Sequence, residues 1–216
     1  MPARFNFPLF LTWCRIVAIP LFVAVLYMPE AWISERNANV LSMWIFIAAA
    51  ITDWLDGYLA RRWGQTSAFG AFLDPVADKL MVAAALILLV DLDRADAYLA
   101  IIIIGREIAI SALREWMAQL GRARNVAVAF IGKIKTVAQM TALIALLLWV
   151  NVIPGISTPI LGTIALWVAA ILTLWSMFHY LKLAAPHFRG EPAPRDPDTL
   201  PRRSAAQVDA AGPPLH

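Results

Sequence analysis

The chain has 216 residues, of which 61% are hydrophobic and only 15% are charged, and its formal net charge at pH 7 is +3. Soluble domains carry about 45–50% apolar and about 25% charged residues, so this composition excludes an ordinary soluble domain and a chain disordered throughout. We therefore expect lipid to surround most of the protein. The small basic excess fits Lys and Arg retained on the cytoplasmic side of a membrane, and no nucleic-acid partner is expected.

Six stretches of the chain are apolar and long enough to cross a bilayer as helices, which takes about 20 residues. We expect an all-α integral membrane protein whose six transmembrane helices are Leu9–Met28, Val40–Ala60, Val76–Leu92, Ala97–Leu120, Val126–Val150 and Ile160–Leu183. The pair Asp74-Pro75 predicts the start of the third helix, because proline is favoured in a first helical turn. The single cysteine, Cys14, excludes an intramolecular disulfide and is expected to be buried.

The basic residues predict how these helices are oriented. Arg36 and Arg94 follow the first and third stretches, no basic residue follows the fifth, and the other basic residues lie at or toward the opposite ends. Both termini are therefore predicted to be cytoplasmic. The membrane domain is expected at 1–183, and residues 184–216, rich in Pro, Arg, Asp and Ala, are expected to form a disordered cytoplasmic tail.

Four aspartates occupy positions where membrane helices rarely carry charge. Asp53 and Asp56 lie near the inner end of the second stretch, and Asp74 and Asp78 lie at the start of the third. Spacings of three and four residues put each pair on one helical face, and the opposite directions of the two helices bring the pairs to the same depth. Converging carboxylates repel one another unless a cation binds, and an all-oxygen ligand set suits Mg²⁺ or Mn²⁺.

Four carboxylates are enough for two ions that share ligands, an arrangement that steadies both attacking and leaving oxygens in phosphoryl transfer. The competing interpretation is structural: Asp74 before Pro75 could cap a helix, and Asp53 could reach water. Four such acids at one depth favour a functional site, because intramembrane acids are functional by default.

Small residues and one arginine complete a pattern around the four acids. Written out, it is Asp53-x2-Asp56-Gly57-x2-Ala60-Arg61-x8-Gly70-x3-Asp74-x3-Asp78. This string resembles the signature of the CDP-alcohol phosphotransferases and matches it at every fixed position. Members of that family are six-helix membrane enzymes that move a phosphatidyl or similar group from a CDP-linked donor to an alcohol and release CMP.

The resemblance also implies roles for individual residues. It implies that Asp53, Asp56 and Asp74 hold one or both metal ions, and that Asp78 holds the second and acts as general base. The residues implied to bind the CDP-linked donor are Gly57, Arg61, Ser67 and Gly70. The family further implies a homodimer.

A second group of charges indicates the acceptor. Arg106 lies too deep in the fourth stretch to reach water, so it needs a cavity and a partner. Together with Arg114 and Lys135 it would suit an acceptor that carries its own phosphate. The competing interpretation is a network of salt bridges from Arg106 and Arg114 to Glu107 and Glu115 that only pins helices together.

Within the family, this stretch is similar to the members that use sn-glycerol 3-phosphate as acceptor. The N-terminal run Asn6-Phe7-Pro8-x2-Leu11-Thr12-x2-Arg15 is also typical of them, except that Leu9 replaces the usual asparagine. The resemblance implies transfer of the phosphatidyl group of CDP-diacylglycerol to glycerol 3-phosphate at the cytoplasmic face of a bacterial inner membrane. The alternatives are another acceptor, either inositol phosphate or phosphatidylglycerol, or a cation-coupled transporter, although no inverted repeat is present.

Overall fold

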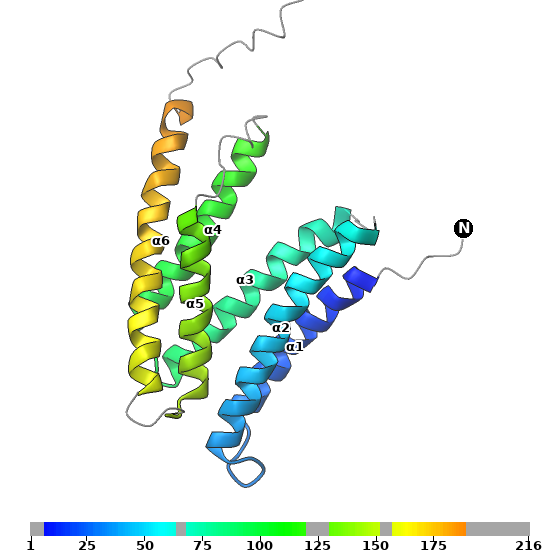
Figure 1. Ribbon diagram of the computed structural model, residues 1–216, viewed down its shortest axis with the longest axis vertical. Coiled ribbons are helices and arrows are strands. Elements are labelled where there is room, and N and C mark those ends of the chain that lie inside the picture. The colour runs from blue at the N-terminus through cyan, green and yellow to red at the C-terminus, as the bar shows by residue number, and fades with distance from the viewer. Residues whose placement is uncertain (1–6, 64–67, 120–129, 152–156, 189–216) are drawn as a thin grey trace, which may run out of the picture. The chain divides into compact units, whose positions relative to one another are not determined.

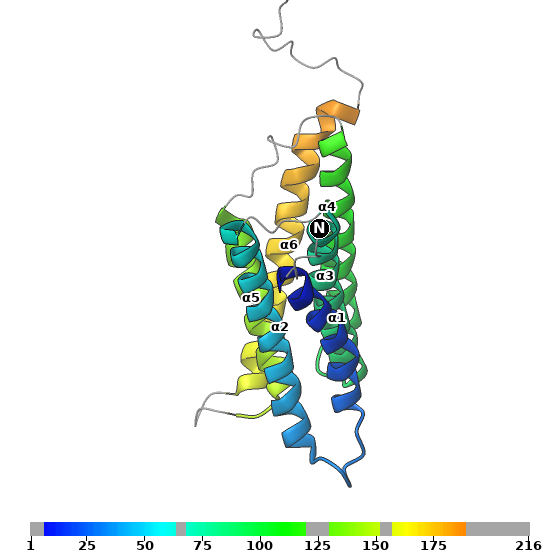
Figure 2. The ribbon, with the colours of Figure 1, turned by 90° about the vertical axis from the view of Figure 1, so that its right-hand side faces the viewer.

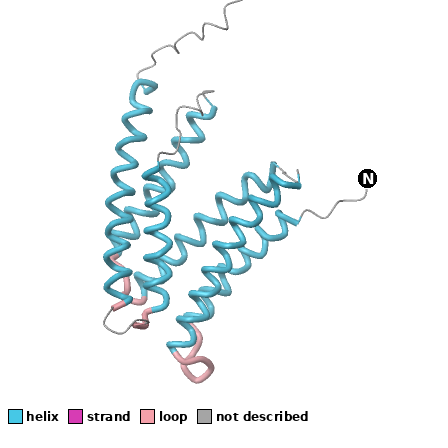
Figure 3. Tube along the Cα trace, viewed as in Figure 1, coloured by secondary structure: helices cyan, strands magenta, loops and turns pink. Residues whose placement is uncertain are grey.

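The computed structural model describes residues 7–63, 68–119, 130–151 and 157–188. All regular structure in these residues is helical, as Figure 3 shows, which confirms the expected all-α class. The helices are α1 (Phe7–Leu26), α2 (Glu35–Trp63), α3 (Ala68–Asp91), α4 (Ala97–Gln119), α5 (Phe130–Leu148) and α6 (Thr158–Phe188). Each predicted apolar stretch falls on one of them.

The chain divides into two compact units, Met1–Leu183 and Ala184–His216. The first unit contains α1 to α5 and most of α6, and it carries every residue of the candidate site. The expected disorder of the tail concerns residues that lie mostly outside the described ranges.

Within the first unit, consecutive helices run in opposite directions and pack mainly through α2 and α3. α1 packs against α2 and α3, α2 packs against α5, and α3 packs against α4 and α5. Figures 1 and 2 show the turns that follow α1 and α3 at the same end of this unit. The start of α3, with its two aspartates, therefore lies at the other end.

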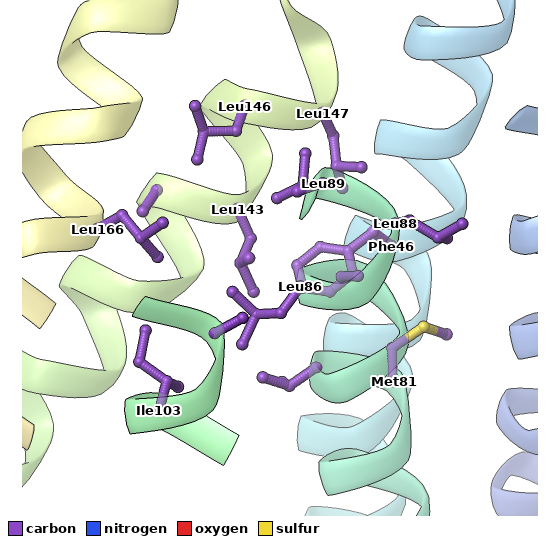
Figure 4. Close-up of a cluster of buried hydrophobic side chains, with 14 of the residues drawn as sticks. Phe46, Met81, Leu86, Leu88, Leu89, Ile103, Leu143, Leu146, Leu147 and Leu166 are labelled. Carbon is purple, nitrogen blue, oxygen red and sulfur yellow. The ribbon is translucent and has the colours of Figure 1, made fainter. Parts of the chain in front are cut away.

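Large apolar side chains from several helices form the core of this unit. Phe46 of α2 and Leu86 of α3 lie together with Leu143 and Leu146 of α5 and Leu166 of α6 (Figure 4). All five are buried. Their burial fixes how the helices are rotated, and so decides which face of α1, α2 and α3 carries the polar residues.

Two sequence-based expectations about α1 and α3 are wrong. Asp74 and Pro75 lie inside α3, because the helix already begins at Ala68. Asp74 bonds to Thr12 of α1, and the apolar residues before it extend the helix toward its N-terminus. Cys14 is exposed, because the buried face of α1 is the one that carries Thr12 and Arg15.

A buried arginine connects several helices at the end of the first unit where the turns after α1 and α3 lie. Arg94, in the turn between α3 and α4, donates to Asn39 Oδ1 at 3.0 Å and pairs with Glu35 Oε1 at 3.1 Å, both on α2. Its guanidinium also lies over the ring of Trp149, 5.1 Å from the centroid, just after α5. Burial lowers the pKa of Arg94 from its ordinary value, and Glu35 opposes this effect. Arg94 thus ties three parts of the fold together.

The helices have the length and surface of membrane helices. Three contain segments that are long and apolar enough to cross a bilayer: Leu9–Leu26, Glu35–Ala60 and Thr158–Lys182. α5 holds a shorter apolar segment, Ile134–Leu148, whereas α3 and α4 carry the charged motif residues along their length. Large apolar side chains lie exposed along the helices, among them Val17, Trp54, Ile101, Val137 and Trp175. Such surfaces require lipid, so this is a membrane protein.

Candidate active site

Two polar side chains on the buried face of α1 organise the first half of the site. Thr12 and Arg15 are one turn apart in an otherwise apolar helix, and they are only 1% and 2% exposed. A buried guanidinium needs charged partners, because its desolvation is otherwise too costly. Both side chains find their partners among the aspartates of the motif.

Arg15 joins the two aspartates of α2. Its Nη1 lies 2.6 Å from Asp53 Oδ1, and its Nη2 lies 2.6 Å from Asp56 Oδ2. Thr12 Oγ1 donates a hydrogen bond of 2.6 Å to Asp74 Oδ1 on α3. Three of the four predicted acids, carried by two helices, therefore contact one turn of α1.

Asp78 of α3 belongs to the same cluster. It lines a small cavity together with Arg15, Ala49, Met81 and Met140, among others. Asp78 is within electrostatic range of Asp53 and of the Arg15 guanidinium. Asp56 is likewise within electrostatic range of Asp53 and Asp74. The packing of α1 against α2 and α3 thus gathers all four acids around Arg15.

The chemistry of this donor set suits a hard divalent cation. In the described part of the chain, no three His, Cys, Asp or Glu side chains already meet in metal-ligand geometry. The contacts of Arg15 and Thr12 take one oxygen from each of three carboxylates and leave the second oxygen outside those contacts. Four carboxylates and one guanidinium leave a formal charge of −3, which attracts cations strongly. These residues therefore fit Mg²⁺ or Mn²⁺.

The residues expected to bind the donor follow the acids along the same helices. Gly57 lies on α2 directly after Asp56 and is half-buried, and Gly70 is buried one turn before Asp74 on α3. Arg61 lies in the last turn of α2, whereas Ser67 lies outside the described residues. The absence of side chains at the two glycines leaves room for close approach beside the acids.

The second half of the site is a charged cluster built from α4, α5 and α6. Arg106 is 7% exposed, and its Nη1 pairs with Glu107 Oε2 at 2.9 Å. Lys135 Nζ of α5 reaches the same Oε2 atom at 3.1 Å. Arg106 Nη2 donates to Ser176 Oγ of α6 at 3.0 Å, while its Nε is buried with no partner in the described residues. A buried N–H without a partner is costly, so this cluster has donor capacity for a further anion.

Arg114 lies two helical turns beyond Arg106, toward the end of α4, and is exposed. Its Nη2 donates to Tyr180 OH at 3.2 Å, and its guanidinium lies 5.3 Å from the centroid of the Tyr180 ring. Ser176 and Tyr180 are four residues apart on α6, so they share one face of that helix. Each accepts a hydrogen bond from one of the two arginines that the sequence predicts to bind the acceptor.

Both interpretations of these charges find support. The ion pair between Arg106 and Glu107 belongs to the purely structural network considered above. Arg114, by contrast, pairs with Tyr180 rather than with an acid among the described residues. Sequence reasoning missed Ser176 and Tyr180, although two polar groups at helical spacing in an apolar segment were a usable signal.

The two halves of the site lie next to each other. Asp78 and Arg15 line one small cavity, Glu107 lines a second, and Val82 of α3 lines both. A group of acids thus lies next to a group of buried cations.

Comparison with known proteins defines the class. The model of the CDP-alcohol phosphatidyltransferase family matches residues 5–175, so the chain belongs to this family, which confirms the resemblance deduced from the aspartate motif. All four aspartates and Arg15, Arg106, Arg114 and Lys135 lie inside the matched region.

The names of similar proteins are more specific than the family. A protein of Pectobacterium atrosepticum is 52% identical over 193 residues, which cover 88% of this chain and 100% of the relative. A protein of Salmonella typhimurium is 52% identical over 183 residues, covering 84% and 96%, and one of Sodalis glossinidius is 51% identical over 185 residues with the same coverage. All three are named CDP-diacylglycerol--glycerol-3-phosphate 3-phosphatidyltransferase.

Proposed function

We propose that this protein transfers the phosphatidyl group of CDP-diacylglycerol to sn-glycerol 3-phosphate, giving phosphatidylglycerol phosphate and CMP. The observation that carries the proposal is that the cavity lined by Asp78 and Arg15 adjoins the cavity lined by Glu107, the residue that pairs with the buried Arg106 and Lys135. The shared name of relatives about half identical to the chain supports the same activity. The protein is accordingly an enzyme of phospholipid biosynthesis.

The acid cluster handles the donor. Asp53, Asp56, Asp74 and Asp78 would hold one or two Mg²⁺ or Mn²⁺ ions. When bound, these ions neutralise the pyrophosphate of the donor and stabilise the charge that develops on its leaving group. Gly57, Arg61, Ser67 and Gly70 would contact the CDP moiety, and Arg61 can pair with a phosphate in bidentate fashion.

Asp78 is the proton acceptor of the reaction. The primary hydroxyl of glycerol 3-phosphate attacks the phosphorus that carries diacylglycerol, its proton passes to Asp78, and the bond to the CMP oxygen breaks. Asp78 lines the cavity beside Arg15, next to the cavity that Glu107 lines, and this position supports its role as the base. The rate gain comes from holding both substrates in one orientation and from balancing their charges.

The cationic cluster handles the acceptor. Arg106, Arg114 and Lys135 would bind the phosphate of glycerol 3-phosphate, and Glu107 keeps two of these cations side by side despite their mutual repulsion. The buried Nε of Arg106, which lacks a partner among the described residues, gains one when a phosphate oxygen arrives. An acceptor without a phosphate leaves these donors unsatisfied and binds poorly.

Six transmembrane helices, cytoplasmic termini and an active site facing the cytoplasm complete the proposal. The distribution of Lys and Arg supports this orientation, and the bacterial relatives support a location in the inner membrane. The diacylglycerol chains then stay in the bilayer while the CDP group reaches the acids. We further propose that the enzyme is a homodimer, as the family resemblance implies.

Release of CMP by the detergent-solubilised protein tests the proposal directly. CDP-diacylglycerol is mixed with glycerol 3-phosphate, glycerol, inositol phosphate or phosphatidylglycerol, and CMP and the lipid product are measured. Among the four acceptors, we expect only glycerol 3-phosphate to support turnover. EDTA should abolish this turnover, and added Mg²⁺ or Mn²⁺ should restore it. Equal use of unphosphorylated glycerol would contradict the phosphate pocket, and full activity after exhaustive chelation would contradict the metal requirement.

A further inference from the structure

Arg15 and Thr12 of α1 contact the acids but have no role in the reaction assigned so far. Arg15 contacts Asp53 and Asp56, and Thr12 contacts Asp74, through hydrogen bonds of 2.6 Å. Both side chains are almost completely buried and belong to the same turn of α1. Their positions are therefore fixed by packing, and they act as rigid donors to three acids on two other helices.

Arg15 and Thr12 each contact only one of the two oxygens of a given carboxylate. Arg15 uses Oδ1 of Asp53 and Oδ2 of Asp56, and Thr12 uses Oδ1 of Asp74. A carboxylate held by one oxygen cannot rotate freely, so its second oxygen is aimed in a fixed direction. Asp53 gains most from this restraint, because its side chain is 40% exposed, whereas that of Asp56 is only 2% exposed.

We propose that Thr12 and Arg15 are positioning residues that orient the metal-binding carboxylates of Asp53, Asp56 and Asp74. This inference rests on the proposed function, because it assumes that these acids bind a divalent cation. Outer contacts of this kind fix the direction of a metal ligand and commonly contribute about 10–100-fold to metal affinity. α1 is then part of the active site although it supplies no ligand.

The positive charge of Arg15 makes the inference testable, because the two possible roles of Arg15 predict opposite changes in the affinity for a divalent cation. If Arg15 acted only as a positive charge beside the site, its removal would strengthen binding of a divalent cation by removing repulsion. If Arg15 positions the ligands, its removal weakens that binding. These two outcomes are opposite.

The experiment is a Mn²⁺ titration of the purified, detergent-solubilised full-length protein without substrates, with free Mn²⁺ followed by electron paramagnetic resonance. We expect Arg15→Gln to raise the Kd for Mn²⁺ by about 10–100-fold. The Kd of Arg15→Lys should lie between those of the wild type and Arg15→Gln, because one ammonium cannot bridge two carboxylates in bidentate fashion. Thr12→Val should raise the Kd in the same direction, while Thr12→Ser, which keeps the hydroxyl, should leave it unchanged.

Arg94→Gln is the matched control. Arg94 is also a buried arginine that ties helices together, but its partners are Glu35, Asn39 and Leu147 O near the opposite ends of the helices. Its loss should lower the melting temperature and leave the Kd for Mn²⁺ as in the wild type. Melting temperatures of all variants separate a loss of fold from a loss of ligand orientation.

Each outcome has one meaning. An unchanged or lower Kd in Arg15→Gln overturns the inference for Arg15, and a normal Kd in Thr12→Val overturns it for Thr12; either result leaves the metal site standing. If Arg15→Gln does not fold, the two Thr12 variants and Arg15→Lys decide in the same way. A wild type that binds no Mn²⁺ overturns the inference together with the metal requirement. Normal Mn²⁺ binding without CMP release contradicts only the proposed transfer reaction.

Discussion

Asp78 lines the small cavity beside Arg15 and is the residue that we propose as general base. We expect Asp78→Asn to lower kcat by about 10²–10⁴-fold, the usual loss when a general base is removed. The measurement is CMP release with saturating substrates. The control is Asp91→Asn, on the same helix but at a residue bonded to Tyr27, and it should retain activity. Wild-type turnover in Asp78→Asn would remove Asp78 from the mechanism.

Arg114 is the acceptor residue whose removal should disturb the fold least, because it is exposed at the end of α4. A charge-assisted hydrogen bond is worth about 1.5–3 kcal/mol, so Arg114→Ala should raise the KM for glycerol 3-phosphate by about 10–100-fold. The KM for CDP-diacylglycerol should stay nearly unchanged. Tyr180→Phe, which loses the hydroxyl but keeps the ring over Arg114, should have a smaller effect in the same direction. Arg61→Ala is expected to weaken the donor instead, and an equal effect of Arg114→Ala on both substrates would refute this division.

Two glycines test how closely the helices pack. A Cβ at Gly162 of α6 would lie 2.9 Å from Leu146 Cγ and 3.2 Å from Ala145 Cβ of α5, whereas a Cβ at Gly105 of α4 would meet nothing within 4 Å. Because Leu146 is fully buried and has little room to move, Gly162→Ala should destabilise the protein by about 1–3 kcal/mol. Gly105→Ala should be neutral or stabilising by up to about 1 kcal/mol, because alanine favours the helix. Thermal unfolding in detergent measures both, and equal melting temperatures would contradict this close contact between α5 and α6.

The proposed orientation of the whole protein can be tested with single cysteines in a Cys14→Ser background. Ser34→Cys, exposed in the turn after α1, should react with a membrane-impermeant maleimide added outside the inner membrane. Ser204→Cys, in the C-terminal tail, should react only after the membrane is broken, because the basic residues keep that end in the cytoplasm. Labelling of both positions from outside would contradict the six-helix orientation.

Much of this fold follows from local features of the chain. Runs of about 20 apolar residues predicted six helices, and the structure places a helix at each. The spacing of Asp53, Asp56, Asp74 and Asp78 predicted a common cluster, and three of these acids do meet at one turn of α1. Helix limits were less predictable, because Asp74-Pro75 is compatible with both the start and the interior of a helix, and only the packing of α1 against α3 selects the interior.

The sequence by itself determined the membrane environment, the helical class and the shared helical faces of the four aspartates, because hydropathy and helical periodicity act over a few turns of one helix. Only the tertiary structure decided which partner holds each charge. Arg15 meets Asp53 and Asp56 across 38 and 41 residues of sequence, and Thr12 meets Asp74 across 62. Hydrogen bonds of 2.6 Å depend on how whole helices are rotated against each other. Buried apolar contacts such as those of Phe46, Leu86 and Leu143 set that rotation, and no local pattern encodes it.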